Sequence, residues 1–186
     1  TNVAGISDAY VRGVKNLMEM GFDPNDEQLK EIFQRVKSIG DKGKRVADAD
    51  LQAIAELVMD LPAVRPIKLE EITVVTGSRV TSTASVRLNL NGKMLTEAAT
   101  GVGPVDAAIN AIKKAVGIVE PIQLDNYSVK AITGGTNAVT EVAVSISKGD
   151  RKATAIGVNE DIVIASVEAM LSGMNVLMTN YNNKKS

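Results

Sequence analysis

The feature that most constrains this chain is an internal repeat in its later part. Residues 66–118 and 121–179 show the same order of patterns, offset by about 56 residues. Each copy has three stretches in which apolar and polar residues alternate, followed by one stretch with helical spacing of apolar residues. Three strands and one helix cannot bury both faces alone, so the two copies are expected to share one core about a pseudo-twofold axis.

The repeat predicts elements at matching places. In the first copy we expect strands and a helix at 67–76, 82–90, 93–100 and 104–116. In the second copy we expect them at 122–133, 138–147, 151–156 and about 160–178. Asn91-Gly92 is a strong hairpin signal, and Asn159 is the expected cap of the last helix.

The first 62 residues have a different pattern, because apolar residues recur there at helical spacing in three stretches. Ser7 or Asp8 is expected to cap the first helix, Asn25 the second and Asp48 the third. The sequence therefore predicts an α+β chain with a three-helix region at 1–62, a pseudo-twofold pair of βββα units and a frayed polar tail at 180–186.

The stretch from 100 to 112 joins a strand to a helix through a glycine turn. Pro104 is expected at the first helical position, where its missing N–H costs little, and Asp106 falls in the first turn, where the helix dipole favours a negative charge. Gly101 and Gly103 leave backbone N–H groups at the open end of this helix, which suits a carboxylate or a phosphate. A glycine pair before a helix is also a common packing turn, so both interpretations remain open.

Composition argues against several classes of function. The chain has 21 basic and 22 acidic residues and only 3% aromatic residues, which argues against nucleic-acid binding and against an anionic membrane surface. It has no cysteine and no histidine, which excludes thiol catalysis, histidine-based triads and metal sites built from these residues in this chain. Its apolar runs stay short of the roughly 18 residues that a membrane span needs, and its start does not resemble a signal peptide, so we expect a cytoplasmic protein.

Three motifs carry a resemblance to a known family: G-V-G-P-V-D-A-A-I-N-A-I at 101–112, L-D-N-Y-S-V-K-A-I-T-G-G-T-N-A at 124–138 and I-G-V-N-E-D-I-V-I-A-S at 156–166. In this order they resemble the C-terminal regulatory domain of alpha-isopropylmalate synthase and the related citramalate synthase. Residues 26–51 resemble the helical linker of the same family, so the likeness covers nearly the whole chain.

This resemblance implies a parent acyltransferase that condenses acetyl-coenzyme A with a 2-oxo acid on a TIM barrel carrying a divalent metal. It implies that residues 66–179 form a regulatory domain, which makes a homodimer and binds leucine or isoleucine as a feedback inhibitor. The barrel is absent from this chain. The chain itself is therefore expected to be non-catalytic and without a cofactor, with the catalytic barrel of the same parent chain as its partner.

A free amino acid needs hydrogen-bond donors for its carboxylate, acceptors for its ammonium group and an apolar slot. The glycine turn offers donors, Asp106 and Asn137 offer acceptors, and Tyr127 is expected to close the slot. Each has a structural alternative, as a dipole partner, a turn residue and a core aromatic residue respectively. The full predicted set is Gly101, Val102, Gly103, Pro104, Val105, Asp106, Leu124, Tyr127, Ala131, Asn137 and Val139.

Three hypotheses of function follow. The preferred one is an allosteric domain that binds a branched-chain amino acid, with leucine as the first choice and isoleucine, the effector of a citramalate synthase, as the second. The next is a dimerisation module without a ligand. The third is a free-standing enzyme that uses carboxylates such as Glu97 and Glu141.

Overall fold

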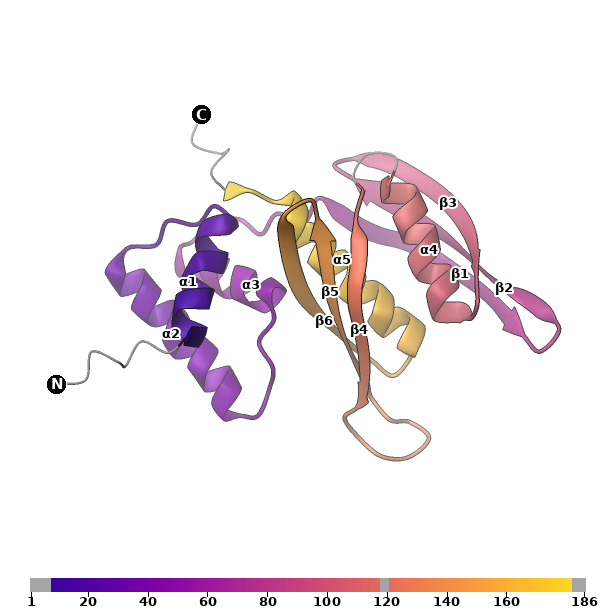
Figure 1. Ribbon diagram of the computed structural model, residues 1–186, viewed down its shortest axis with the longest axis horizontal. Helices are drawn as coiled ribbons and strands as arrows, with labels where there is room; N and C mark the ends of the chain where they lie inside the picture. Colours follow the sequence, from indigo (N-terminus) through magenta and orange to yellow (C-terminus); the bar gives the residue numbers. More distant parts are fainter. Residues whose placement is uncertain (1–7, 118–120, 182–186) are drawn as a thin grey trace. The chain divides into compact units, whose positions relative to one another are not determined.

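The computed structural model describes residues 8–117 and 121–181 (Figure 1). The chain divides into two compact units, one made of Thr1–Val64 with Thr179–Ser186 and the other of Arg65–Met178. Three helices are followed by two three-stranded antiparallel sheets, each of which continues into a helix. The predicted α+β architecture is confirmed.

The first unit contains α1 (Asp8–Glu19), α2 (Asp26–Asp41) and α3 (Asp48–Val58). The expected cap of α2 is confirmed. The Asn25 side chain accepts a hydrogen bond from the Gln28 N–H at 2.9 Å, and the Gln28 side chain accepts from the Asn25 N–H at 3.0 Å. Of the two residues expected to cap α1, Ser7 lies outside the described residues, and Asp8 is the first residue of the helix.

The start of α3 differs from the prediction that Asp48 is its cap. The N-cap residue is Ala47, whose N–H donates to the Asp50 side chain at 2.8 Å. Asp48 is the first helical residue, and its carboxylate accepts a hydrogen bond from the Asn16 amide at 2.8 Å. The sequence pattern did not show whether Asp48 is the N-cap or the first helical residue, because acidic residues are favoured at both positions.

The end of the described chain packs into the first unit, which corrects the prediction that the tail is frayed from residue 180. The Tyr181 ring stacks on Phe22 with 4.4 Å between ring centroids, and its N–H donates to the Met20 carbonyl at 3.1 Å. The Tyr181 hydroxyl donates to the buried Glu56 carboxylate. Because most residues after 179 are polar, the sequence did not indicate that the Tyr181 side chain is buried.

The second unit begins with the first βββα copy: β1 (Ile67–Gly77), β2 (Val80–Leu90), β3 (Lys93–Gly101) and α4 (Pro104–Gly117). Its strands pair in the order β1-β2-β3, so β2 is central. The buried face of β2 shows the expected alternation, with Ala84, Val86 and Leu88 inward. Asn91 and Gly92 both have positive φ, as the predicted hairpin requires.

The second copy repeats this order with β4 (Gln123–Ala131), β5 (Thr140–Lys148), β6 (Arg151–Asn159) and α5 (Ile162–Met178). Val142, Val144 and Ile146 form the buried face of β5, at the positions that the repeat predicts. The cap of α5 is corrected from Asn159 to Asp161, because the Asp161 carboxylate accepts from the N–H groups of Val163 and Ile164. Asn159 instead accepts from the Asp161 N–H.

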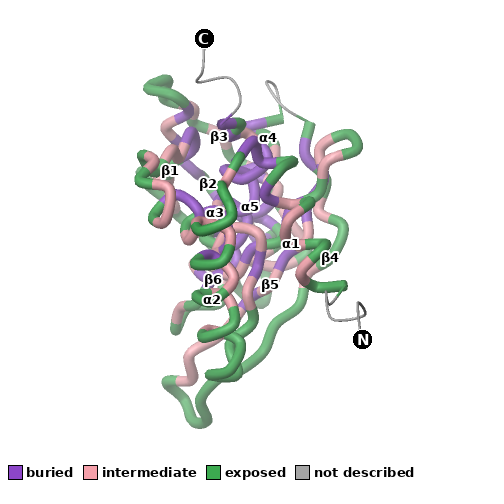
Figure 2. The backbone as a smooth tube through the Cα atoms, turned by 90° about the vertical axis from the view of Figure 1, so that its left-hand side faces the viewer, coloured by how far each residue is buried: buried purple, intermediate pink, exposed green. Residues whose placement is uncertain are grey.

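The two helices of the second unit pack against the sheets and against each other. α4 packs on β2 and β3, whereas α5 packs on β5 and β6 and also contacts β1. Figure 2 shows α5 as buried along much of its length, which suits a helix that is apolar on nearly all sides. This sharing of one core by two copies agrees with the expectation that neither copy is stable alone.

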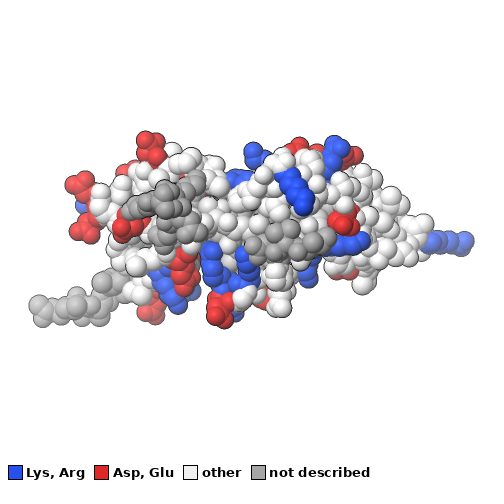
Figure 3. Space-filling view, turned by 90° about the horizontal axis from the view of Figure 1, so that it is seen from above, with Lys and Arg blue, Asp and Glu red and all other residues white. Residues whose placement is uncertain are grey.

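The charged side chains are mixed in sign, since acidic and basic groups occur side by side on the face shown in Figure 3. Exposed ion pairs include Glu31 with Arg35 and Glu71 with Arg87. Among the helices of the described residues, none combines the length and the apolar composition needed to cross a lipid bilayer.

Candidate functional site

The glycine turn before α4 combines one tightly packed glycine with one open one. A Cβ atom on Gly101 would lie 2.2 Å from the Ala107 nitrogen, so this position needs glycine for the close approach of strand and helix. A Cβ atom on Gly103 would meet nothing within 4 Å. Gly101 is therefore needed for packing, whereas the backbone at Gly103 is accessible from outside.

The first turn of α4 leaves two backbone donors open. Ala107 donates to the Gly103 carbonyl at 3.0 Å, and Val102, which is fully exposed, donates to Asp106 Oδ2 at 2.9 Å. Within the described part of the chain, the N–H groups of Val105 and Asp106 have no acceptor. Pro104 starts the helix as predicted and has no N–H to satisfy.

The equivalent turn before α5 is closed by its own side chains. Asp161 accepts from two N–H groups of the first turn of α5, at 2.7 and 3.2 Å. Gly157 is packed so tightly that a Cβ atom there would lie 2.0 Å from the Ala165 carbonyl oxygen. Of the two turns related by the repeat, the one before α4 is thus the one that retains donors for an anion.

Three predicted residues lie on one face of β4. A register shift between Leu124 and Asn126 inserts one extra residue, which brings Leu124 and Tyr127 to the same side of the strand. Their partners on β5 are Ile146 and Val144, both buried, so this side faces the core of the unit. Ala131, at the end of the strand, lies on the same side and is exposed.

The Tyr127 hydroxyl is held by α5. It lies 2.8 Å from the Ser166 hydroxyl, which donates its only proton to the Ile162 carbonyl at 2.6 Å. Tyr127 is therefore the donor to Ser166, and its ring is half-buried beside the first turns of α5. This contact fits the alternative in which Tyr127 is a core aromatic residue with a satisfied hydroxyl.

The remaining two predicted residues lie in the connection between β4 and β5. Val139 is fixed there, because its N–H donates to the Thr133 hydroxyl and its carbonyl accepts from the Ile132 N–H, both at 2.9 Å. Asn137 is exposed and falls in the same connection. The sequence placed both residues in this segment but could not show which of them the backbone bonds hold.

The eleven predicted residues fall into two groups. One group lies before and at the start of α4, at 101–106, and the other lies on β4 and in the connection after it, at 124–139. Among the described residues, no hydrogen bond or ion pair links the two groups. Their joint use by one ligand therefore remains a prediction.

Sequence reasoning missed two contributors to these groups. Ser166 binds the Tyr127 hydroxyl, and nothing local to either residue indicates a pairing across 39 positions. Val129 shares the core side of β4 with Tyr127 and is 45% exposed, and strict alternation would have found it.

The carboxylates of the third hypothesis do not form a pair within one sheet. Glu97 belongs to β3 and makes an ion pair with Lys114 at 3.1 Å, whereas Glu141 belongs to β5 in the other sheet. In the described residues no three acidic side chains come together as a metal site would require.

Comparison with known proteins gives a consistent result. The family described as the LeuA allosteric (dimerisation) domain matches residues 45–178. A protein of Methanosarcina mazei named "Putative (R)-citramalate synthase CimA" is 52% identical over 87% of this chain and 34% of its own length. In Methanocaldococcus jannaschii, a 2-isopropylmalate synthase is 48% identical over 87% of this chain and 31% of its own length. An (R)-citramalate synthase CimA of that organism is 47% identical over 86% and 33%.

The chain thus spans about a third of the length of the curated relatives it matches. The family match covers the two βββα copies entirely and begins at Arg45, shortly before α3. The chain belongs to the LeuA allosteric (dimerisation) domain family.

Proposed function

We propose that this chain is the regulatory part of a larger LeuA-family synthase and that it binds a branched-chain amino acid as a feedback inhibitor. The observation that carries the proposal is the open turn before α4 in a chain that belongs to an allosteric domain family. The parent synthase would join an acetyl group from acetyl-coenzyme A to a 2-oxo acid, and this chain would modulate that reaction rather than perform it.

The proposed ligand contacts follow from the chemistry of a free amino acid. The N–H groups of Val105 and Asp106 would bind its carboxylate, with the dipole of α4 favouring the negative charge. The Oδ1 atom of Asp106, which has no partner among the described residues, would accept from the ammonium group. The apolar side of β4, from Leu124 through Tyr127, would cover the aliphatic side chain.

Two effectors are supported by specific relatives. Leucine is the expected effector if the parent is an isopropylmalate synthase, and one relative carries that name. Isoleucine is the expected effector if the parent is a citramalate synthase, and two of the relatives given above carry that name, one at 52% and one at 47% identity. The two ligands differ in the position of one methyl group, so a direct comparison of their binding decides between the parents.

A homodimer is the second part of the proposal, and β4 offers a surface for it. Seven of its nine residues are exposed, including Val129, and Ile132 just beyond it is 49% exposed. α5 packs on β5 and β6, and Figure 2 shows most of β4 as exposed. A second copy would bury these apolar groups, and the family description supports such an association.

The effector would act through α5. Tyr127 and Ser166 link β4 to the start of this helix, and the chain after its end returns to the helical unit, where Tyr181 is buried. An effector inhibits only if it binds one arrangement of these elements more tightly than another. The proposal therefore requires effector binding to change the behaviour of the helical unit as well.

Hydrogen exchange measured by mass spectrometry tests the location of the effector. With saturating L-leucine or L-isoleucine, peptides covering 101–106 and 124–139 should exchange more slowly, and D-leucine should leave them unchanged. Protection confined to other peptides would overturn the proposed contacts.

Sedimentation equilibrium tests the dimer. Val129→Glu should lower the association, because it places a charge on the apolar side of β4. Val75→Glu is the matched control, since Val75 is 55% exposed on the first sheet. An equal effect of both substitutions, or a wild-type monomer, would contradict the use of β4.

A further inference from the structure

The helical unit contains a cavity of about 240 Å³ that the family match leaves without a role. It lies among α1, α2 and the start of α3, and its α1 wall consists of residues one helical turn apart. At about 30 Å³ for each water in the liquid, its volume equals that of roughly eight waters, which is the scale of a small metabolite. Its lining residues are Ala9, Arg12, Gly13, Asn16, Phe33, Val36, Val46, Ala47, Asp48 and Leu51.

Charged groups of opposite sign line this cavity. Asp48 and Asn16 are joined by a 2.8 Å hydrogen bond in which Asn16 Nδ2 is the donor, so the Asn16 Oδ1 atom is not used in that bond. Arg12 lies one turn before Asn16 on α1 and has no hydrogen-bond or ion-pair partner among the described residues. Arg12 is exposed, so the cavity presents a solvated guanidinium group together with the Asp48 carboxylate, which the Asn16 amide already orients.

The start of α3 supplies the acidic side of this cavity. Its N-cap residue, Ala47, is buried and lines the cavity, and its N–H donates to the Asp50 carboxylate at 2.8 Å. The first turn of α3 thus carries the carboxylates of Asp48 and Asp50 at the positive end of the helix dipole.

The rest of the wall is apolar. Phe33, Val36 and Leu51 come from two helices, and Gly13 permits the Phe33 ring to lie against α1, since a Cβ atom there would be 2.8 Å from the ring. A carboxylate, a guanidinium group and an apolar wall together match the ammonium group, the carboxylate and the side chain of an apolar α-amino acid.

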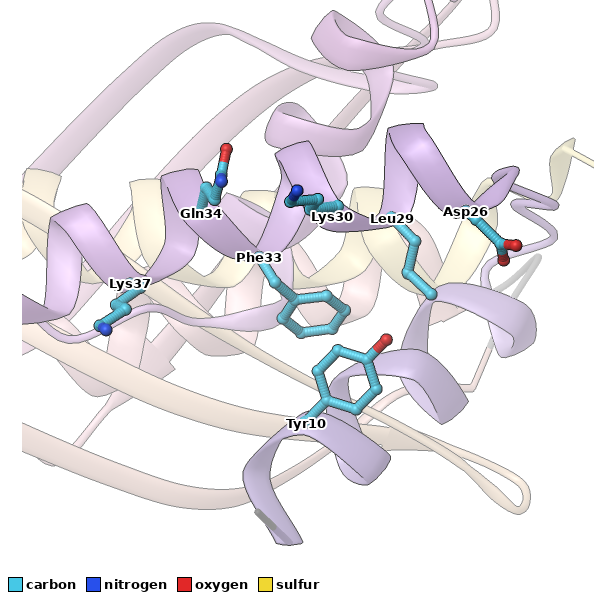
Figure 4. A pocket seen from close by; sticks show the side chains of 7 residues that line it. All are labelled: Tyr10, Asp26, Leu29, Lys30, Phe33, Gln34 and Lys37. Carbon is cyan, nitrogen blue, oxygen red and sulfur yellow. The ribbon is translucent and has the colours of Figure 1, made fainter. Parts of the chain in front are cut away.

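A larger depression of about 560 Å³ also has Phe33 in its wall but fits a ligand less well. Figure 4 shows the rings of Phe33 and Tyr10 together, with 4.4 Å between their centroids, while Lys30 and Gln34 extend away from them. Its polar groups thus point away from the aromatic rings (Figure 4), whereas the lining of the smaller cavity includes the hydrogen-bonded pair of Asn16 and Asp48.

We propose that the smaller cavity is a second ligand site, which binds a free L-α-amino acid with an aliphatic side chain. Arg12 binds the ligand carboxylate, Asp48 and Asn16 Oδ1 accept from its ammonium group, and Phe33, Val36 and Leu51 contact its side chain. This site lies in the helical unit, apart from the effector contacts proposed for 101–106 and 124–139, and it does not depend on them.

The test is a titration of the whole chain, labelled with nitrogen-15, with L-valine, L-leucine and L-isoleucine, and with D-valine as a control. The amide signals of Gly13, Asn16, Ala47 and Leu51 should shift and saturate with an L-amino acid only. Arg12→Gln and Asp48→Asn should each weaken this binding by about tenfold or more, because each removes a charged hydrogen-bond partner. Asp48→Asn keeps an oxygen for the Asn16 amide, so the fold is retained.

Arg35→Gln is the matched control, since Arg35 is exposed on α2, pairs with Glu31 and lines neither cavity. Unchanged affinity in this variant supports the site. Absent shifts at the four amides, or shifts that persist at full affinity in both test variants, would overturn it. Shifts confined to 101–106 and β4 would also overturn this second site while leaving the proposed regulatory function intact.

Discussion

The side-chain amide of Asn175 makes with Ile67 the two hydrogen bonds that a neighbouring strand would make. The Ile67 N–H donates to Asn175 Oδ1 at 2.8 Å, and Asn175 Nδ2 donates to the Ile67 carbonyl at 3.0 Å, across 108 positions of the sequence. Both residues are buried, and β1 begins at Ile67. One side chain of α5 thereby ties the second βββα copy to the free edge of the first.

Replacing Asn175 with alanine should destabilise the second unit by about 2 to 5 kcal/mol, because it leaves a buried N–H and a buried carbonyl without partners. Chemical denaturation followed by circular dichroism measures this loss. Asn110→Ala is the control, since Asn110 makes one exposed bond to the Thr100 carbonyl. A loss below 1 kcal/mol for Asn175→Ala would show that the amide is not a structural link.

The tight packing of Gly157 gives a second prediction. A methyl group at this position would lie 2.0 Å from the Ala165 carbonyl oxygen, so Gly157→Ala should cost about 2 kcal/mol or more as α5 is pushed from β6. Gly40→Ala should instead stabilise the chain by about 0.5 to 1 kcal/mol, because Gly40 lies inside α2 with open space around it. Equal thermal shifts for the two variants would contradict this packing.

A substitution at Gly103 distinguishes an effect on folding from an effect on the proposed effector binding. Its Cβ position is open and its φ is not positive, so Gly103→Val should leave the unfolding transition nearly unchanged. The added side chain would still crowd the backbone donors of the turn before α4, and effector binding should fall by at least tenfold. Calorimetric titration and a denaturation curve on the same preparation check both statements. Full affinity in the variant would exclude this turn from the effector site.

Tyr181 gives a prediction specific to the helical unit. Tyr181→Phe removes the hydroxyl that donates to Glu56 and lies 3.3 Å from the Pro62 carbonyl oxygen, so it should lower the stability of this unit by about 1.5 to 3 kcal/mol. Tyr127→Phe is the matched control, because it removes a hydroxyl bond in the second unit alone. Hydrogen exchange should show faster opening of α1 and α3 in the first variant only, and unchanged exchange there would contradict the prediction.

Much of the fold was predictable because the repeat carries two periodicities in a fixed order. Alternation around Val86 and Val142 identified the two central strands, and Asn91-Gly92 identified a hairpin that needs positive φ at both positions. These signals are local, since each depends on residues within one strand or one turn.

The errors arose where local signals were equal or where the partner was distant. Asn159 and Asp161 are both good caps two positions apart, and only the backbone path decides which oxygen reaches the N–H groups of α5. Tyr181 makes its hydrogen bond with Glu56 across 125 positions, so the polar residues around Tyr181 did not indicate that its side chain is buried.

The candidate site was predictable in part for the same reason. The turn at 101–106 is a local motif, and the structure leaves its donors open. The contact of Tyr127 with Ser166 depends on a register shift in β4 and on the packing of α5, which no short motif encodes.

The most direct test of the account is isothermal titration of the chain with L-leucine, L-isoleucine and L-valine, using D-leucine as the control. The account predicts saturable binding of a branched-chain L-amino acid that Gly103→Val weakens, with leucine indicating an isopropylmalate synthase parent and isoleucine a citramalate synthase parent. Absence of heat with all three L-amino acids, in a chain that sediments as a dimer, would contradict effector binding and favour a dimerisation module without a ligand.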